Sequence, residues 1–287
     1  MNGFIDSILQ FQFMKYALIA GLLCSISCGI IGSYIVVRRI TYIAGGIAHS
    51  TLGGMGAARF LQVNYNIDWC TPTLGAVIAA LIAALIIGMV SLRAKQREDT
   101  VISAIWAIGM AAGILFISQT PGYSEDLMNY LFGNILMVTQ TDIYIIAILD
   151  ALIIVLCFIT YKPLLAICFD EEFARVKNIN VELYQLLLLL LTALTVVLLT
   201  IVVGIVMVIA LLAIPAAIAG RLTQSLLGMM AWAIILSGFF TSLGLKISFD
   251  MNMPTGSIII MVAGITYLIS ILIKKPVKKL GHKQGAL

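Results

Sequence analysis

The chain has 287 residues, of which 62% are hydrophobic and only 10% are charged, and its formal net charge is +4. A soluble globular domain is typically about half apolar and about a quarter charged. This composition therefore excludes a soluble globular protein and predicts a polytopic membrane protein. Nine spans of roughly 20 residues would use about 180 positions, which leaves no room for a soluble catalytic domain. The five cysteines form no CxxC pair, so we expect no disulfide framework.

Nine apolar runs, separated by charged residues, proline or glycine, are candidate membrane spans. They fall at 13–37, 40–61, 72–92, 100–119, 141–161, 183–203, 205–219, 226–247 and 255–273. We therefore expect an all-α bundle of about nine (eight to ten) transmembrane helices in a single domain over residues 1–287. Gly204 alone separates the sixth and seventh runs, which could instead form one broken helix. Residues 127–138 are too short to span and are expected at the outer surface.

Lysine and arginine gather at one set of span ends, and this bias indicates the orientation of the chain. The first run is too long for the apolar part of a signal peptide and is followed by Arg38 and Arg39, so we expect a retained span. With these two arginines in the cytoplasm, 14 of the 17 basic residues fall on that side. We expect an extracytoplasmic N-terminus, a cytoplasmic C-terminus with a basic tail at about 274–287, and no nucleic-acid partner.

The second run differs from the others because small residues surround a histidine. Glycine, alanine and serine occupy nine of the fourteen positions from 45 to 58, around His49. Small residues let helices approach closely in lipid, and Gly45, His49 and Gly53 share one helical face. The imidazole is therefore expected in a packed interior, as a transition-metal or substrate ligand on a transport path. The alternative is a packed histidine bonded to a backbone carbonyl.

Two further groups within the apolar runs could carry chemistry. Asp150 lies near the middle of the fifth run, where an aspartate costs about 2.5–3.5 kcal/mol to insert. Its helical neighbours are apolar, so a partner must come from another helix; it is either a relay or metal-path residue or a satisfied structural carboxylate. Cys24 and Cys28 share a face, as two soft ligands can, although buried cysteine is also an ordinary packing residue.

Two segments on the cytoplasmic side are longer than turns. Leu164–Glu182 carries charges of both signs on an expected short helix, and Pro215–Leu226 carries a helix out of the membrane. Either segment could dock a soluble partner or be a solvated loop. The chain has no GxxxxGK[ST] phosphate loop and no HExxH motif, so we expect no enzyme, and any ATP must be bound by another chain.

Together these residues resemble the integral membrane permeases of ABC importers for zinc, manganese and iron, the ABC-3 family. The likeness covers nearly the whole chain. Its blocks are Gly32–Arg39 (GSYIVVRR), His49 with its glycines, Tyr130–Thr139 (YLFGNILMVT), Phe169–Val181 (FDEEFARVKNINV), Leu211–Arg221 (LLAIPAAIAGR) and Met253–Ile258 (MPTGSI). Several blocks in the right order are far more specific than any one of them.

The resemblance implies an ABC importer permease in the plasma (inner) membrane of a prokaryote, in contact with membrane lipid. It implies two permease copies as a homodimer, two cytoplasmic ATP-binding subunits, and an extracytoplasmic binding protein that delivers the metal. No cofactor would be bound permanently, because the metal is the cargo. The residues implied in ATPase docking are Pro215, Ala216, Ala217, Gly220 and Arg221 in one segment and Asp170, Glu171 and Arg175 in the other.

One departure from the family pattern bears on the metal. The family's second span usually has an aspartate four residues before the histidine, and here that position is Gly45. His49 is thus implied as a pathway residue without its carboxylate partner, and Asp150 is a further candidate. Imidazole suits Zn²⁺, whereas Mn²⁺ prefers oxygen ligands, so zinc is favoured over manganese or iron. Asn178 also stands where the family often has glycine.

The alternative function is an ATP-independent secondary transporter or channel for a metal ion or small cation. It would use His49 and Asp150 as an ion or proton relay within one chain. Transport by the chain alone, without an ATPase, would distinguish it from the importer.

Overall fold

The computed structural model describes residues 10–93, 98–120, 131, 133, 135–251 and 253–273, and these contain helices but no strand. The helices are α2 (Gln12–Arg38), α3 (Thr41–Tyr65), α4 (Pro72–Arg93), α5 (Glu98–Ser118), the 3-10 helix η1 (Ile135–Met137), α7 (Gln140–Ile159), α8 (Tyr161–Phe169), α9 (Glu171–Val176), α10 (Val181–Val203), α11 (Ile205–Leu222), α12 (Leu226–Met251) and α13 (Thr255–Leu272). The all-α prediction is confirmed for this part of the chain.

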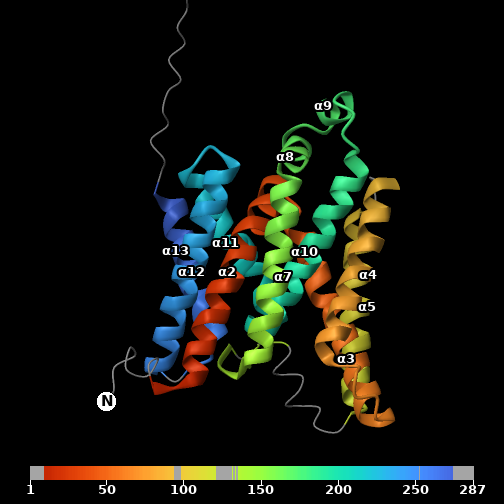
Figure 1. The fold of residues 1–287 in the computed structure, drawn as a ribbon, viewed down its shortest axis with the longest axis vertical. Coiled ribbons are helices and arrows are strands. Elements are labelled where there is room, and N and C mark those ends of the chain that lie inside the picture. Colours follow the sequence, from red (N-terminus) through yellow and green to blue (C-terminus); the bar gives the residue numbers. More distant parts are fainter. Residues whose placement is uncertain are drawn as a thin grey trace, which may run out of the picture.

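Seven of the described helices are long and apolar enough to cross a bilayer: α2, α4, α5, α7, α10, α12 and α13. The expected number was nine. The other two predicted spans correspond to α3, which contains five glycines beside its polar residues, and to α11, whose apolar stretch Met207–Leu222 is shorter. Both lie in the same bundle as the seven (Figure 1). The chain is therefore a multi-pass membrane protein.

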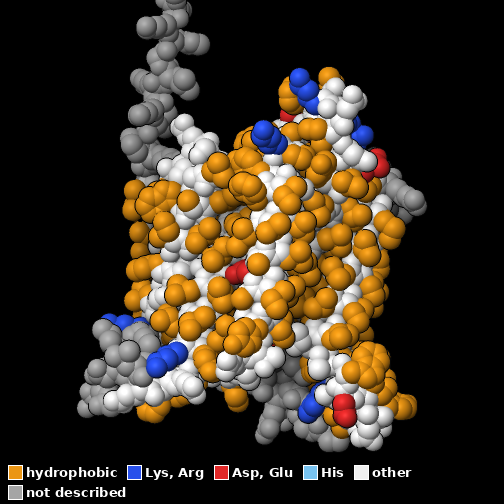
Figure 2. Space-filling model, in the orientation of Figure 1, with side chains coloured by type: hydrophobic (Ala, Val, Ile, Leu, Met, Phe, Trp, Pro, Cys, Tyr) orange, Lys and Arg blue, Asp and Glu red, His pale blue; other side chains and the backbone are white. Residues whose placement is uncertain are grey.

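The bundle has two flanks and a centre. Figure 1 shows α3, α4 and α5 together on one side and α12 and α13 on the other, with α2, α7, α10 and α11 between them. One cluster of buried apolar side chains runs from α2 to α13 and joins the parts. Figure 2 shows an apolar band across the face in view, with Lys and Arg side chains gathered toward its two ends. This distribution is that expected for a protein surrounded by lipid.

Glycine decides two features of the backbone. Gly204 has φ 78°, a conformation that L side chains rarely adopt, and it ends α10 and begins α11 as two separate helices. Gly54 of α3 faces Gly75 of α4, and a Cβ at Gly54 would lie 2.1 Å from the Gly75 carbonyl oxygen. The small residues of α3 therefore bring helix backbones into contact, as the sequence predicted.

Both ends of the bundle contain segments singled out in the sequence. Helices α8 and α9 follow α7 at the end where α2 stops at Arg38 (Figure 1). At the opposite end, η1 lies within the predicted surface segment 127–138, and Thr139 and Asp142 form a capping box that starts α7. The predicted basic tail at 274–287 lies outside the described residues.

Candidate functional site

His49 lies in the middle of α3, and its side chain is buried against α5. Its imidazole stacks on the indole of Trp106, with ring centroids 4.2 Å apart and an interplanar angle of 10°. The indole Nε1–H donates to the sulfur of Met110, one turn further along α5, at 3.2 Å. His49 Nδ1 is buried and has no hydrogen-bond partner among the described residues. The stacking therefore holds the His49 imidazole in a fixed plane, with Nδ1 free to accept or donate one hydrogen bond or to bind a metal ion.

Gly45 lies one turn before His49 and has no side chain, so residues of other helices fill the space next to the imidazole. A Cβ at Gly45 would lie 2.9 Å from Ile209 Cδ1 and 3.7 Å from Trp106 Cζ3. Ile209 of α11 and Trp106 of α5 thus occupy the volume that a side chain at position 45 would enter. Residue 45 supplies no ligand, and the described part of the chain holds no cluster of three or more His, Cys, Asp or Glu side chains suited to a metal ion.

Asp150 is at a separate point of the bundle. It lies on α7 with 2% of its surface exposed, and the Ser27 hydroxyl of α2 donates to its Oδ1. Its Oδ2 is buried without a partner among the described residues. The prediction that another helix supplies the partner of Asp150 is confirmed, since Ser27 does so. The structure does not bring Asp150 beside His49, which packs on α5.

Cys24 and Cys28 are both buried on α2, on the helix that also carries Ser27. They join the apolar core cluster, together with Ala17, Ala20 and Ile31 of the same helix. Within the described residues they are free cysteines. This arrangement agrees with cysteine as a small packing residue.

The two predicted docking segments meet at one end of the bundle. A groove of about 390 Å³, here called the end groove, is lined by Ala217, Gly220 and Arg221 of α11 and by Phe169 at the end of α8. Phe169 is 69% exposed, so an apolar ring stands open at this end. Pro215 and Ala216 are buried inside the bundle and shape α11 rather than its surface.

Two charged residues of the second docking segment, Asp170 and Glu171, have partners within the chain. Arg38 donates from Nη2 to Glu171 Oε1 at 2.6 Å and from Nη1 to the Ile167 carbonyl oxygen at 2.6 Å, which ties α9 and α8 to the end of α2. Asp170 caps α9 by accepting from the Phe173 amide at 2.9 Å. Arg175 is exposed in the last turn of α9.

The backbone conformation at residue 178 explains why asparagine can stand where the family often has glycine. Its φ is 56°, in the left-handed region that glycine adopts freely and that asparagine tolerates better than most residues. The turn from α9 to α10 therefore needs this backbone conformation, and Asn178 meets the need without glycine.

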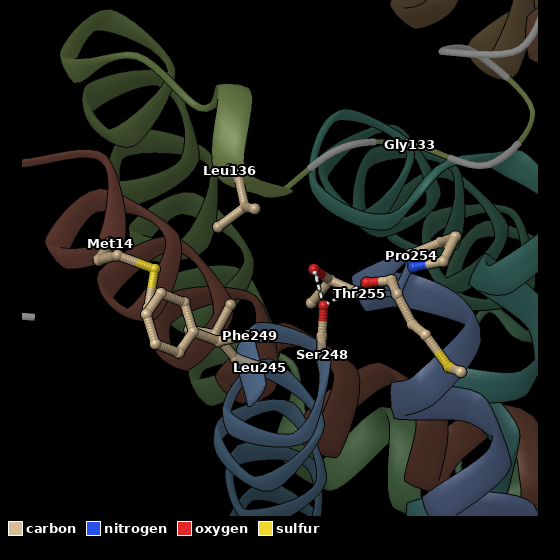
Figure 3. Close-up of a pocket in the computed structure, with 9 residues that line it drawn as sticks. Met14, Gly133, Leu136, Leu245, Ser248, Phe249, Pro254 and Thr255 are labelled. Atoms are coloured by element: carbon tan, nitrogen blue, oxygen red, sulfur yellow. Dashed lines mark hydrogen bonds between the residues drawn. The ribbon is translucent and has the colours of Figure 1, made fainter. Parts of the chain in front are cut away.

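A cavity of about 430 Å³ at the opposite end was missed by sequence reasoning (Figure 3). Met14 of α2 and Leu136 of η1 line it on one side, and Ser248 and Thr255 line it on the other. The Ser248 hydroxyl donates to the Met253 carbonyl oxygen at 2.5 Å and lies 2.8 Å from the Thr255 hydroxyl. These two hydroxyls of the cavity wall therefore have partners within the chain. Residues so far apart in the chain give no spacing signal from which it could be predicted.

The chain matches the ABC 3 transport family over residues 10–274. It belongs to this family. The resemblance drawn from the sequence blocks is confirmed, and the family is one of transport permeases rather than enzymes. Membership does not favour the alternative of an ATP-independent transporter or channel.

Several relatives match this ABC 3 chain over nearly its full length. A protein of Synechocystis, "Uncharacterized membrane protein slr2045", is 44% identical over 267 residues, covering 93% of this chain and 92% of its own. A "Probable metal transport system membrane protein" of Chlamydia muridarum is 41% identical over 259 residues, covering 90% and 88%. The "Manganese import system permease protein ScaB" of Streptococcus parasanguinis is 31% identical over 283 residues, covering 98% of both chains.

The fold is also that of a solved structure that is similar in sequence. A structure titled "PsaBC from Streptococcus pneumoniae in complex with Fab" superposes with a TM-score of 0.84 at 32% sequence identity, and the match covers 94% of this chain and 95% of the other. The arrangement of helices around His49 and around the end groove is thus set in an ABC permease fold.

Proposed function

We propose that this chain is the membrane-spanning permease subunit of an ATP-driven ABC importer of a divalent transition metal. The observation that carries the proposal is the buried imidazole of His49, whose Nδ1 has no partner among the described residues. Neutral imidazole is a common transition-metal ligand, and an ionisable group at membrane depth is a candidate for an ion path. The printed names of relatives as metal and manganese transport proteins support this class of cargo.

In this proposal His49 is a transient ligand on the metal path. A transport path must bind its ion strongly enough to admit it and weakly enough to release it. A single imidazole per subunit meets that need better than a complete ligand set, which would hold the ion. The metal is the cargo, and the permease keeps no cofactor.

Zinc is the favoured cargo on the chemistry of this site. Gly45 supplies no carboxylate beside His49, and imidazole suits Zn²⁺, whereas Mn²⁺ prefers oxygen ligands. Manganese is the second candidate, because relatives such as ScaB are named for it, and iron is the third. Uptake of one labelled metal in competition with the other two separates these candidates.

The partners follow from the two ends of the bundle. Two cytoplasmic ATP-binding subunits dock on the end groove and on α9 through Ala217, Gly220, Arg221 and Arg175, and ATP hydrolysis belongs to them. Pro215, Ala216, Asp170 and Glu171 act by holding α11, α8 and α9 in place. An extracytoplasmic binding protein delivers the metal at the opposite end.

A second permease copy completes the path as a homodimer. Trp106 is 36% exposed, so the site at His49 is only one side chain away from the surface of the bundle. A partner copy that packs there could add its own imidazole. A C₂ dimer would bring the same patch of each copy together.

In this proposal the chain is a single permease domain that crosses a prokaryotic plasma membrane nine times, with α3 and α11 as spans. The bias of Lys and Arg supports a cytoplasmic location for α8 and α9, an extracytoplasmic N-terminus and a cytoplasmic C-terminus.

Purification and reconstitution test the proposed function. The permease should co-purify with an ATP-binding subunit, and metal uptake into liposomes should require both that subunit and ATP. Uptake by the permease alone without ATP would contradict the importer and support the secondary transporter.

Asp150 remains a separate proposal for a second point on the path. Its free Oδ2 is the observation that supports it. In the reconstituted importer, Asp150→Asn keeps the size of the side chain and removes its charge. Loss of uptake with normal assembly would support a path role, and unchanged uptake would leave Asp150 as a structural group.

A further inference from the structure

A groove on the outside of the bundle lies between α2, α7 and α12, and we call it the lateral groove. It has a volume of about 590 Å³. Ile30 of α2, Ile154 and Phe158 of α7, and Leu227 and Met230 of α12 form its apolar walls. Phe158 is 84% exposed, so the wall is open on its outer side. The groove is distinct from the site at His49, which lies between α3 and α5.

The apolar walls place the groove in contact with lipid. Helices α2, α7 and α12 are all long and apolar enough to cross a bilayer. An apolar surface on such helices is covered by acyl chains unless protein covers it. The walls alone would accept any lipid, so selectivity must come from polar groups.

Polar groups are present at the end of the groove nearest α8. Tyr34 is among the residues that line the groove, but its hydroxyl is buried and has no hydrogen-bond partner among the described residues. Tyr161 and Lys162, at the start of α8, line the same end of the groove.

The charge at the α8 end of the lateral groove is positive, which suits an anionic ligand. Lys162 is exposed, and the ion pair found among the described residues joins Arg38 to Glu171 and leaves Lys162 out. No Asp or Glu lines the lateral groove within the described part of the chain. Basic pockets between helices at a membrane surface bind anionic lipid headgroups.

We propose that the lateral groove binds an anionic phospholipid of the leaflet next to α8. An acyl chain lies along Ile154 and Phe158, and the phosphate pairs with the exposed Lys162 next to Tyr161. The proposal rests on the membrane placement of the helices. It does not depend on which metal is transported or on the role of His49.

Native mass spectrometry of the delipidated permease, in complex with its partner subunits, tests the proposal. The probes are phosphatidylglycerol and phosphatidylcholine with identical acyl chains. Wild-type protein should bind the anionic lipid more tightly. Lys162→Gln should weaken phosphatidylglycerol binding about fivefold, the factor expected for one basic residue near an anionic lipid surface, and leave phosphatidylcholine unchanged. Lys177→Gln, at the same end on α9 but outside the groove, is the matched control and should bind as wild type.

Two further variants separate the groove from general lipid contact. Ile154→Trp should fill the groove and reduce binding of both lipids. Ile148 is also on α7 and is 69% exposed, but it lies outside the groove. Ile148→Trp should therefore leave lipid binding unchanged. Thermal unfolding of each variant checks that it is folded.

Three outcomes would overturn the proposal. The first is an equal preference for phosphatidylglycerol in wild type and in Lys162→Gln. The second is wild-type lipid binding by a folded Ile154→Trp variant. The third is a cross-link from position 158 to a second copy of the chain, which would make the groove a protein interface. None of these measurements uses metal uptake, so failure of the transport proposal would be seen separately.

Discussion

The imidazole of His49 lies flat on the indole of Trp106, at 4.2 Å between ring centroids and 10° between planes. This stacking fixes the plane in which the imidazole nitrogens point, because the ring cannot turn about its χ2 axis without losing the contact. Gly45 permits it, since a side chain at position 45 would compete for the same space. The pair His49 and Trp106 is therefore the centre of the predictions for transport.

Replacing the imidazole should stop transport without disturbing the fold. We expect His49→Ala to abolish metal uptake by the reconstituted complex while the permease still assembles with its ATP-binding subunit. Ser50→Ala is the matched control, because Ser50 is the next residue of α3 and its hydroxyl donates to the Ile47 carbonyl oxygen of its own helix, at 2.7 Å. Wild-type uptake by His49→Ala would remove this residue from the path.

Loss of the stacked indole should weaken the site less than loss of the imidazole itself. Trp106→Ala frees the ring of His49, and we expect uptake at limiting metal to fall roughly tenfold, as for other groups that orient a metal ligand. Trp106→Phe keeps an aromatic face and should retain more activity. A raised KM for metal with little change in maximal rate would indicate a positioning role, whereas equal uptake by all three proteins would contradict it.

A carboxylate at position 45 should change the choice of metal. Gly45→Asp alone meets Ile209 at 2.9 Å, so the variant is best combined with Ile209→Ala, which makes room for the new side chain. The added oxygen ligand beside His49 should shift uptake from Zn²⁺ toward Mn²⁺. Competition between the two metals measures the shift, and Ile209→Ala alone is the control. An unchanged ratio would show that position 45 does not face the ion.

The bond between Ser27 and Asp150 should contribute to stability. Ser27→Ala leaves both carboxylate oxygens of a buried side chain without a partner, so we expect a loss of about 1–3 kcal/mol in the free energy of unfolding. Ser33→Ala, also buried on α2, removes only a bond to the Gly29 carbonyl oxygen and should cost less. Denaturant unfolding in detergent compares the two, and equal losses would argue against a specific role for the Ser27 bond.

Filling the end groove should block the ATPase partner. Ala217→Trp places an indole in the groove lined by Phe169 and Arg221, and we expect co-purification of the ATP-binding subunit to be lost. Leu183→Trp is a control on α10, at the same end and already 57% exposed. Normal association of Ala217→Trp would show that the partner docks elsewhere.

Sequence patterns predicted the helices well because a membrane span is a local property. A run of about twenty apolar residues must satisfy its own backbone hydrogen bonds, so it forms a helix whatever its neighbours are. The predicted runs agree with the helices from α2 to α13 within a few residues, and Gly204 does separate α10 from α11. Family membership was also predictable, because several sequence blocks in a fixed order can be recognised without any knowledge of three-dimensional contacts.

What the sequence by itself determined is the membrane class, the helical runs and the family, and it singled out His49 and Asp150 as rare ionisable groups within the apolar runs. Only the tertiary structure decided which groups face them. Trp106 stacks on His49, Ser27 bonds to Asp150 across 123 positions, and Phe169 joins Ala217 and Arg221 in one groove. Helices that are apolar on most faces carry little pattern to say which face meets which neighbour, so these contacts depend on packing between distant segments.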